Sequence, residues 1–359
     1  MKKIMTIVGA RPQFIKAAVV SRALQNAGIK EIIVHTGQHF DANMSDIFFE
    51  EMQIPRPDYN LEINNLHHGA MTGRMLESIE KVLLKESPDV VLVYGDTNST
   101  LAGALAAKKL NIMVAHVEAG LRSFNLAMPE EINRILTDRI SDILFCPTAT
   151  SVKNLKNEGF DAFGSQILQV GDVMYDAALF YEKLSDRKST IIHDLKIGDE
   201  KYILCTIHRQ ENTDNAASLL SIMDALNTLN HEIKVIIPLH PRTRHIIKNQ
   251  GIKTSFQVLD PVGYFDMIQL IRHSHLVMTD SGGLQKEAYF YGKYCITVRD
   301  QTEWTELVEN GYNFLTGANK EKIISVCTNL MNQKPVEFSL QLYGDGKASV
   351  KIADALKDK

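Results

Sequence analysis

The sequence predicts an α/β protein of two Rossmann-like, doubly wound domains. Short apolar runs alternate with helical patterns along the chain, and its 359 residues suit about two domains of roughly 100–200 residues each. The apolar runs are nearly uninterrupted, which is typical of strands that are buried on both faces of a parallel sheet. We therefore expect right-handed strand–helix–strand crossovers in both halves.

In the first half, the pattern predicts strands at residues 4–8, 31–36, 90–94, 113–117, 143–147 and 167–170. Helices are expected between them at 14–26, 72–86, 99–109, 130–141 and 149–158. Several of these units run strand, turn, helix without a long linker, as in a parallel sheet. We place the N-terminal domain at residues 1–168.

In the second half, strands are expected at 202–206, 234–238, 256–259, 276–279 and 295–298. Helices are expected at 216–229, 242–249, 264–272, 283–291 and 319–331, with a closing helix over 346–356. The second domain is placed at 169–344, after a hinge near 169–178. Ligands of such sheets bind beyond the carboxyl ends of the strands, so we expect an interdomain cleft.

Composition excludes several classes of protein. The chain has 39 Lys+Arg and 43 Asp+Glu, a net charge of −4, which gives no general attraction to nucleic acid or anionic membranes. A hydrophobic content of 45% argues against disorder. The four cysteines are far apart, and no apolar stretch reaches the ~20 residues of a membrane span. We expect a cytoplasmic protein without a disulfide scaffold or a metal site.

Familiar cofactor and hydrolase motifs are missing after the predicted strands. The first strand leads into Gly-Ala-Arg-Pro-Gln-Phe (residues 9–14) rather than GxGxxG, and neither a Walker A nor a GxSxG sequence occurs. These absences argue against nicotinamide chemistry, P-loop phosphate binding and α/β-hydrolase chemistry. Function must then be carried by other polar residues at the strand ends.

Two strand-to-helix turns are suited to bind phosphate. Arg11 and Lys16 follow the first strand, where a helix N-terminus offers N–H groups to an anion. In the Asp-Ser-Gly-Gly turn at 280–283, Ser281, Gly282 and Gly283 open a helix in the same way, and Glu287 one turn later could bind a ribose diol. The alternatives are a surface turn in the first case and ordinary helix capping in the second.

Carboxylates and histidines also follow predicted strands. Asp96, Glu118 and Glu130 would repel one another unless a ligand with positive character lies between them, so together they favour acid–base chemistry, although each alone could be a cap or an ion-pair partner. His208 and Arg209 follow the first strand of the second domain and suit a phosphate or a proton transfer. The histidines lack the spacing of metal ligands.

These segments resemble, in order and nearly end to end, the non-hydrolysing UDP-N-acetylglucosamine 2-epimerases. The similarity rests on the turns at 9–16 and 95–97, on His-Val-Glu-Ala-Gly-Leu-Arg (116–122), Pro-Glu-Glu-Ile-Asn-Arg (129–134), His-Arg-Gln-Glu-Asn (208–212) and Asp-Ser-Gly-Gly (280–283) with Glu287. It implies two domains of the glycosyltransferase-B type, with the C-terminal helix (345–359) packing on the first. It also implies a homodimer that uses neither NAD nor a metal.

The resemblance assigns roles to the candidate residues. Asp96, Glu118, Glu130 and His208 match the family's catalytic positions, and Arg11, Lys16 and Arg209 lie in its substrate-binding segments. Ser281, Gly282, Gly283 and Glu287 match its UDP site. The implied isomerase reaction inverts C2 of UDP-GlcNAc to give UDP-ManNAc, by elimination and re-addition of UDP through a glycal, for surface polysaccharide synthesis.

Three departures bear on the sugar. Ala10 and Gln13 stand where the family commonly has Thr and Glu, and Trp304 stands in place of an Arg. This combination resembles the branch containing UDP-2,3-diacetamidoglucuronate 2-epimerases, in which Trp304 could pack on an acetamido methyl and Arg299 could meet a carboxylate. In the alternative, Trp304 only fills the wall of the site. A hydrolysing 2-epimerase, a UDP-sugar glycosyltransferase and a UDP-sugar-binding regulator remain rivals.

Overall fold

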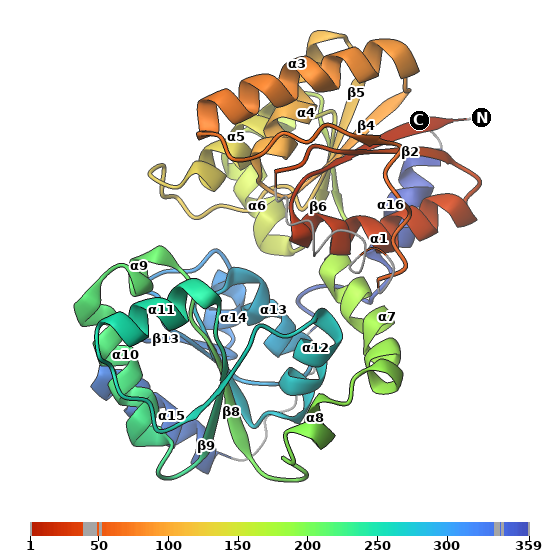
Figure 1. The fold of residues 1–359 in the computed structure, drawn as a ribbon. Coiled ribbons are helices and arrows are strands. Elements are labelled where there is room, and N and C mark those ends of the chain that lie inside the picture. The colour runs from red at the N-terminus through yellow and green to blue at the C-terminus, as the bar shows by residue number, and fades with distance from the viewer. Residues whose placement is uncertain (1, 39–48, 50–51, 334–337, 339–340, 358–359) are drawn as a thin grey trace. The chain divides into compact units, whose positions relative to one another are not determined.

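The computed structural model describes residues 2–38, 49, 52–333, 338 and 341–357, and the chain divides into two compact units. Unit 1 comprises Met1–Leu179 and Gln341–Lys359, and unit 2 comprises Phe180–Leu340. Each unit is a parallel sheet with helices on both faces, so the predicted fold class is confirmed (Figure 1). The division falls within helix α7 (Val173–Lys188), which is later than the expected boundary at 168.

Unit 1 contains a seven-stranded sheet in the order β3-β2-β1-β4-β5-β6-β7. Its strands are β1 (Lys3–Val8), β2 (Lys30–His35), β3 (Tyr59–Asn60), β4 (Val90–Tyr94), β5 (Met113–Val117), β6 (Ile143–Cys146) and β7 (Gln166–Gln169). Its helices include α1 (Arg11–Asn26), α3 (His68–Glu86), α4 (Asn98–Lys109), α5 (Pro129–Ile140), α6 (Ala149–Asn157) and α16 (Ala348–Lys357). A 3₁₀ turn, η1 (Phe160–Ala162), follows α6.

Alternating side chains of the strands fill the two layers of unit 1. Met5 and Ile7 of β1 pack with apolar residues of α3 and α4, while α1 and α16 lie together on the opposite face (Figure 1). Gly9 makes the first turn possible, because a Cβ there would lie 2.1 Å from Thr36 Oγ1 and 2.2 Å from Ser99 Oγ. Glycine suits this close approach of the ends of β1 and β2 to the first turn of α4.

The closing helix α16 is held to unit 1 by a carboxylate on α7. Asp176 accepts the backbone N–H groups of Ala348 (3.0 Å) and Ser349 (2.7 Å) and the hydroxyl of Ser349 (2.6 Å). Helix N-termini leave N–H groups without partners inside the helix. Asp176 supplies the missing acceptor from another element, and so ties the C-terminal segment to the rest of the unit.

Replacing this carboxylate should destabilise the protein. We expect Asp176→Ala to lower the free energy of unfolding by about 1–2 kcal/mol, the usual effect of removing a helix-capping group. Asp354→Ala is a matched control, because Asp354 lies on the exposed side of α16, the helix whose N-terminus Asp176 caps. Thermal unfolding checks the prediction, and equal melting temperatures for the two variants would contradict it.

Unit 2 contains a six-stranded sheet in the order β10-β9-β8-β11-β12-β13. The strands are β8 (Tyr202–Thr206), β9 (Lys234–Pro238), β10 (Gln257–Leu259), β11 (Leu276–Thr279), β12 (Cys295–Thr297) and β13 (Asn313–Leu315). The helices include α8 (Ile191–Asp194), α9 (Gln210–Thr213), α10 (Ala216–Leu229), α11 (Pro241–Asn249), α12 (Tyr264–His273), α13 (Gly282–Phe290), α14 (Thr305–Glu309) and α15 (Lys320–Asn332). Ile203 and Cys205 face the core beneath α10 and α15, and Tyr202 and Leu204 face α12 and α13.

Most predicted strands and helices are found within one or two residues of their expected ends, although α3 begins four residues early. The short elements β3, β13, α8, α9 and α14 were not predicted, nor was α7, which begins inside the expected hinge at 169–178. Among the described residues, no helix is both long and apolar enough to cross a lipid bilayer.

Candidate active site

Three of the predicted site residues in unit 1 follow neighbouring strands. Arg11 begins α1 after β1, Asp96 follows β4, and Glu118 follows β5. The strand order changes direction between β1 and β4, and ligands of doubly wound sheets bind beyond the carboxyl ends of the strands at such a point. The topology therefore brings these three turns to one edge of the sheet.

Glu118 and Lys16 form a buried ion pair between Oε2 and Nζ, with side-chain exposures of 8% and 11%. The backbone of Glu118 is left-handed, with φ of +73°, a conformation that costs a non-glycine residue energy and is found often at functional sites. Gly95 lies against the pair, since a Cβ there would be 3.4 Å from Lys16 Nζ and 3.6 Å from Glu118 Oε2. The fold thus holds the Glu118 carboxylate in one place.

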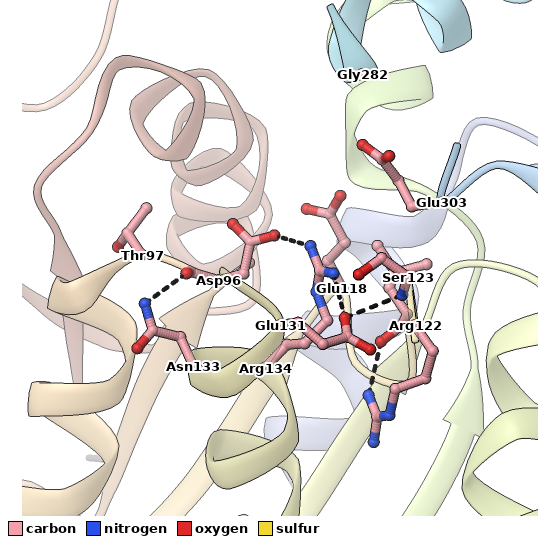
Figure 2. A network of polar contacts seen from close by, with 12 residues as sticks. Asp96, Thr97, Glu118, Arg122, Ser123, Glu131, Asn133, Arg134, Gly282 and Glu303 are labelled. Atoms are coloured by element: carbon pink, nitrogen blue, oxygen red, sulfur yellow. Dashed lines mark hydrogen bonds and ion pairs between the residues drawn. The ribbon is translucent and has the colours of Figure 1, made fainter. Parts of the chain in front are cut away.

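Asp96 belongs to a second ion-pair network, in which the guanidinium of Arg134 reaches between Asp96 and Glu131 (Figure 2). Arg134 Nη1 lies 2.5 Å from Glu131 Oε2, and its other nitrogen contacts Asp96 Oδ2. Asn133 donates to the backbone carbonyl of Asp96 at 2.9 Å. The Asp96 side chain remains one-third exposed, so one predicted carboxylate is both fixed by a cation and open to a ligand.

Glu130 and Glu131 are neighbours with different environments. Glu131 is fully buried and accepts the backbone N–H groups of Ser123 (2.9 Å) and Phe124 (2.8 Å) as well as the guanidinium of Arg134. Glu130 is exposed in the first turn of α5 and belongs to neither network among the described residues. The structure therefore joins Lys16 to Glu118 and leaves Glu130 apart from both ion-pair groups.

In unit 2, Asp280 organises the segment that follows β8. It is fully buried and accepts the backbone N–H groups of His208 (3.1 Å) and Arg209 (3.0 Å) and the amide of Asn212 (3.1 Å). His208 Nδ1 also lies 3.2 Å from Asp280 Oδ1, and the histidine side chain is half-exposed. Burial acts to raise the pKa of Asp280, but these hydrogen bonds and the His208 charge outweigh it and hold the pKa below its usual value.

Asp280 is therefore an orienting group for His208 rather than the cap of the next helix. With Nδ1 directed to Asp280, the other ring nitrogen, Nε2, is left to face outward. The sequence pattern alone indicates a helix cap for Asp280, and its position directly after an apolar strand is the signal that it lies at the site edge.

The N-terminus of α13 has no side-chain cap, and the Glu303 carboxylate lies beside Gly282. Ser281 is the N-cap residue, but the Ser281 side chain makes no capping bond; the backbone N–H of Ser281 donates to Thr279 Oγ1 at 2.9 Å. Gly283 is exposed, and a Cβ built on it meets nothing within 4 Å. Uncapped N–H groups and the helix dipole together favour a phosphate at this end.

Gly283 offers a sharp test of that binding site. Because a Cβ has free space there and alanine favours helix over glycine by about 1 kcal/mol, Gly283→Ala should fold at least as stably as the wild type. If a diphosphate approaches this backbone, the added methyl blocks it, and we expect the Kd for UDP to rise at least tenfold by calorimetry. Unchanged UDP affinity would place the phosphates elsewhere.

Glu287 lies one turn further along α13 and is only 8% exposed. Burial raises the pKa of the Tyr264 and Tyr291 hydroxyls, and the nearby Glu287 carboxylate adds to the effect. The carboxylate thus shares its surroundings with two neutral tyrosines. Its assignment to a ribose remains a prediction.

Two of the departures from the family pattern are structural in this fold. Gln13 is 1% exposed: its Oε1 accepts Gly9 N–H (2.8 Å), and its amide donates to the Tyr94 carbonyl (2.7 Å), which a glutamate could not do. Trp304 is 3% exposed, donates its indole N–H to the Gly282 carbonyl (2.9 Å), and lies under Lys286, whose Nζ is 4.1 Å from the ring centroid.

The expected apolar surface of Trp304 is therefore absent from unit 2, because the indole is covered and supports the first turn of α13. Arg299 is also buried and pairs with Glu303 at 3.1 Å. Neither side chain is exposed for the contact with an acetamido group or a carboxylate that the sequence pattern indicates. Over the described parts of the chain, no group of three or more His, Cys, Asp or Glu side chains could hold a metal ion.

Comparison with known proteins extends this picture. The family model described as UDP-N-acetylglucosamine 2-epimerase matches residues 22–357. The UDP-2,3-diacetamido-2,3-dideoxy-D-glucuronate 2-epimerase of Pseudomonas aeruginosa is 57% identical over 356 residues, which is 99% of each chain.

Solved structures agree in fold. The crystal structure of Methanocaldococcus jannaschii UDP-GlcNAc 2-epimerase in complex with UDP-GlcNAc and UDP matches with a TM-score of 0.90 and 43% identity, covering 99% of this chain and all of that one. The enzyme of Neisseria meningitidis bound to UDP-GlcNAc matches with a TM-score of 0.88 and 32% identity, again over 99% of this chain and all of that one.

Proposed function

Because the chain belongs to the UDP-N-acetylglucosamine 2-epimerase family, and is thus an isomerase that acts on UDP-sugars, we propose that it inverts C2 of a UDP-2-acetamido sugar by elimination and re-addition of UDP. The C2 hydrogen of such a sugar is not beside a carbonyl, so its direct removal would be very slow. Breaking the C1–O bond to UDP first develops positive charge at C1, which makes the C2 hydrogen acidic.

The proposed steps are balanced without a redox cofactor. UDP leaves with the electron pair of the C1–O bond, a carboxylate takes the proton from C2, and the C2–H electron pair forms the C1=C2 bond of a glycal. A proton then returns to the opposite face of C2, and UDP adds back at C1. Two proton-transfer groups on opposite faces are needed, together with a stabilising site for the departing diphosphate.

Residues of unit 1 supply the proton-transfer groups in this proposal. Asp96, Glu118 and Glu130 serve as the acid–base and charge-stabilising set. The support is that Asp96 and Glu118 are each fixed by a cation, Arg134 and Lys16. A fixed carboxylate loses little freedom when the transition state forms, which is what preorganisation requires.

Residues of unit 2 bind the nucleotide in this proposal. We assign the diphosphate to the α13 N-terminus (Ser281, Gly282 and Gly283) and to His208 and Arg209, and the ribose to Glu287, with Arg11 adding positive charge from unit 1. The uncapped helix end and the Asp280-oriented His208 support this assignment. Binding the departing UDP firmly would keep it available for re-addition.

For the sugar, the identity of 57% with the P. aeruginosa enzyme favours UDP-2,3-diacetamido-2,3-dideoxyglucuronate as the substrate. UDP-GlcNAc, with UDP-ManNAc as product, is the second candidate, because the 43% identical M. jannaschii structure holds UDP-GlcNAc. Either product would serve as a precursor of a surface polysaccharide. The departures at Gln13 and Trp304 do not decide between them, since both side chains are engaged within their own units.

The two sugars should be compared directly in D₂O. We expect solvent deuterium at C2 of the product by NMR, no net release of UDP at equilibrium, and kcat/KM at least about 100-fold higher for the preferred sugar, or ~2.7 kcal/mol of discrimination. Protium retained at C2 would exclude elimination. Stoichiometric free UDP would instead indicate a hydrolysing 2-epimerase, and transfer of the sugar to an acceptor a glycosyltransferase.

We also propose a homodimer acting in the cytoplasm. Ile132 and Leu136, one turn apart on α5, are 44% and 46% exposed, which suits a subunit contact. Light scattering should then give about twice the chain mass of 40.3 kDa. A monomer at micromolar concentration would contradict the proposal.

A further inference from the structure

His116 lies on β5, two residues before Glu118, and it is fully buried. Its Nδ1 is 2.7 Å from Asp138 Oδ1, and its Nε2 is 2.7 Å from the backbone carbonyl oxygen of Gly95. A carbonyl oxygen can only accept a hydrogen bond, so Nε2 must carry a proton. The protonation of the whole ring then depends on Asp138.

Asp138 accepts hydrogen bonds from other neighbours as well. Its second oxygen accepts Arg122 Nη1 at 2.7 Å and the backbone N–H of Gly120 at 3.1 Å. Burial acts to raise the pKa of Asp138, but the bonds and charges of His116 and Arg122 outweigh it and keep the pKa below its ordinary value. An ionised Asp138 is an acceptor only, so Nδ1 of His116 must also be a donor.

The charged groups around His116 and Asp138 are Arg122 and, beyond it, Glu158. Arg122 also pairs with Glu158 through Nε (2.6 Å) and Nη2 (2.8 Å), so the cluster holds two carboxylates and one guanidinium. The remaining titratable neighbour is the buried thiol of Cys146, whose pKa is raised to about 12 chiefly by burial, so it stays neutral. Glu158 is exposed, so solvent screens its charge, and the buried groups are Asp138, Arg122 and the His116 ring, with a donor facing each Asp138 oxygen.

We infer that His116 is a positioning residue that donates from both ring nitrogens and fixes the Gly95–Asp96 peptide from behind the site. Gly95 has φ of +62° and lies against the Lys16–Glu118 pair, so its carbonyl orientation sets both that contact and the start of Asp96. Asn133 holds the next carbonyl, that of Asp96, at 2.9 Å. His116 and Asn133 thus donate hydrogen bonds to two consecutive backbone carbonyls, those of Gly95 and Asp96. Asp96 carries one of the proposed catalytic carboxylates.

The effect of His116 on catalysis rests on the proposed function, whereas the protonation of its ring does not. Because neither His116 nor Asp138 reaches solvent, both act through Gly95 rather than on the substrate. Loss of the hydrogen bond from His116 to the Gly95 carbonyl should move Asp96 and Glu118 relative to the sugar. Small misplacements of reacting groups can lower the rate by up to about 100-fold. The diphosphate and ribose contacts assigned to unit 2 should be unaffected.

The first experiment measures the ring directly in the wild-type protein. With ¹⁵N-histidine labelling at pH 8, where ordinary imidazoles with pKa of about 6.5 are neutral, one of the 12 histidines should show two protonated ring nitrogens. That signal should vanish in His116→Gln and persist in the exposed-site control His245→Gln. A neutral tautomer at His116 would overturn the inference whatever the reaction proves to be.

The second experiment separates positioning from binding. We expect His116→Gln to lower kcat at least tenfold while the Kd for UDP stays within about twofold, and His245→Gln to match the wild type in both. If His116→Gln fails to fold, Asp138→Asn tests the same point, because it leaves the ring neutral with Nε2–H still on Gly95, and the two-proton signal should disappear. Wild-type kcat in a folded His116→Gln would refute the positioning role, whereas an inactive wild type would refute the proposed function instead.

Discussion

Glu118→Gln is expected to lower kcat by roughly 100-fold or more, the usual loss for a proton-transfer group. Glutamine keeps nearly the shape of glutamate and can still accept from Lys16, but it cannot take a proton from C2 or stabilise positive charge at C1. The UDP affinity should stay within about twofold, because Glu118 is not among the residues assigned to the nucleotide, which are Arg11 and residues of unit 2. Steady-state kinetics and calorimetry measure the two quantities separately.

The matched control is Glu77→Gln, because Glu77 also pairs with a lysine, Lys81, at 2.7 Å, but on an exposed helix surface. Surface pairs of this kind contribute little, so this variant should behave as the wild type. A Glu118→Gln enzyme with kcat within a few-fold of the wild type would reduce Glu118 to a structural partner of Lys16.

The adjacent glutamates of α5 should give opposite results. Glu131→Ala leaves Arg134 and two backbone N–H groups without their buried acceptor, and removal of one member of a buried ion pair costs about 3–5 kcal/mol of stability. Glu130→Ala should change stability by less than about 0.5 kcal/mol, as at other exposed positions, but it should lower kcat if Glu130 transfers a proton.

Urea unfolding of both variants measures the stabilities, and turnover at a temperature where both are folded measures the activities. Two results would contradict the assignment: a Glu131→Ala protein as stable as the wild type, or a Glu130→Ala protein with undiminished kcat. In the second case, acid–base chemistry would rest on Asp96 and Glu118 alone.

Sequence patterns were sufficient for the strands that are buried on both faces, since a run such as that of β4 has few other interpretations. They failed for β3 and β13, which are only two and three residues long and lie at the edges of the sheets. Edge strands contact a single neighbour and need no apolar run. Their pairing follows from the rest of the sheet and not from local sequence.

The candidate site was predictable as a set of turns but not as a set of contacts. Arg134 and Asp96 are 38 positions apart, and only the packing of α5 beside α4 and β5 brings them together. Likewise, the position of Asp280 after β11 suits both helix capping and the orientation of His208. The choice depends on the side-chain rotamer, which the sequence does not encode locally.

The left-handed backbone of Glu118 has a consequence for how this position tolerates change. Only glycine, and to a lesser degree asparagine and aspartate, adopt such a conformation readily. In a library of all amino acids at this codon, glycine and asparagine should relieve the backbone cost of about 1–2 kcal/mol, but they remove the buried partner of Lys16, so neither should rank above glutamine for cellular abundance. Scored instead by turnover, every one of them should fall together, and glutamate alone should survive. Selection for folding would therefore tolerate several residues at position 118, whereas selection for turnover would retain glutamate alone.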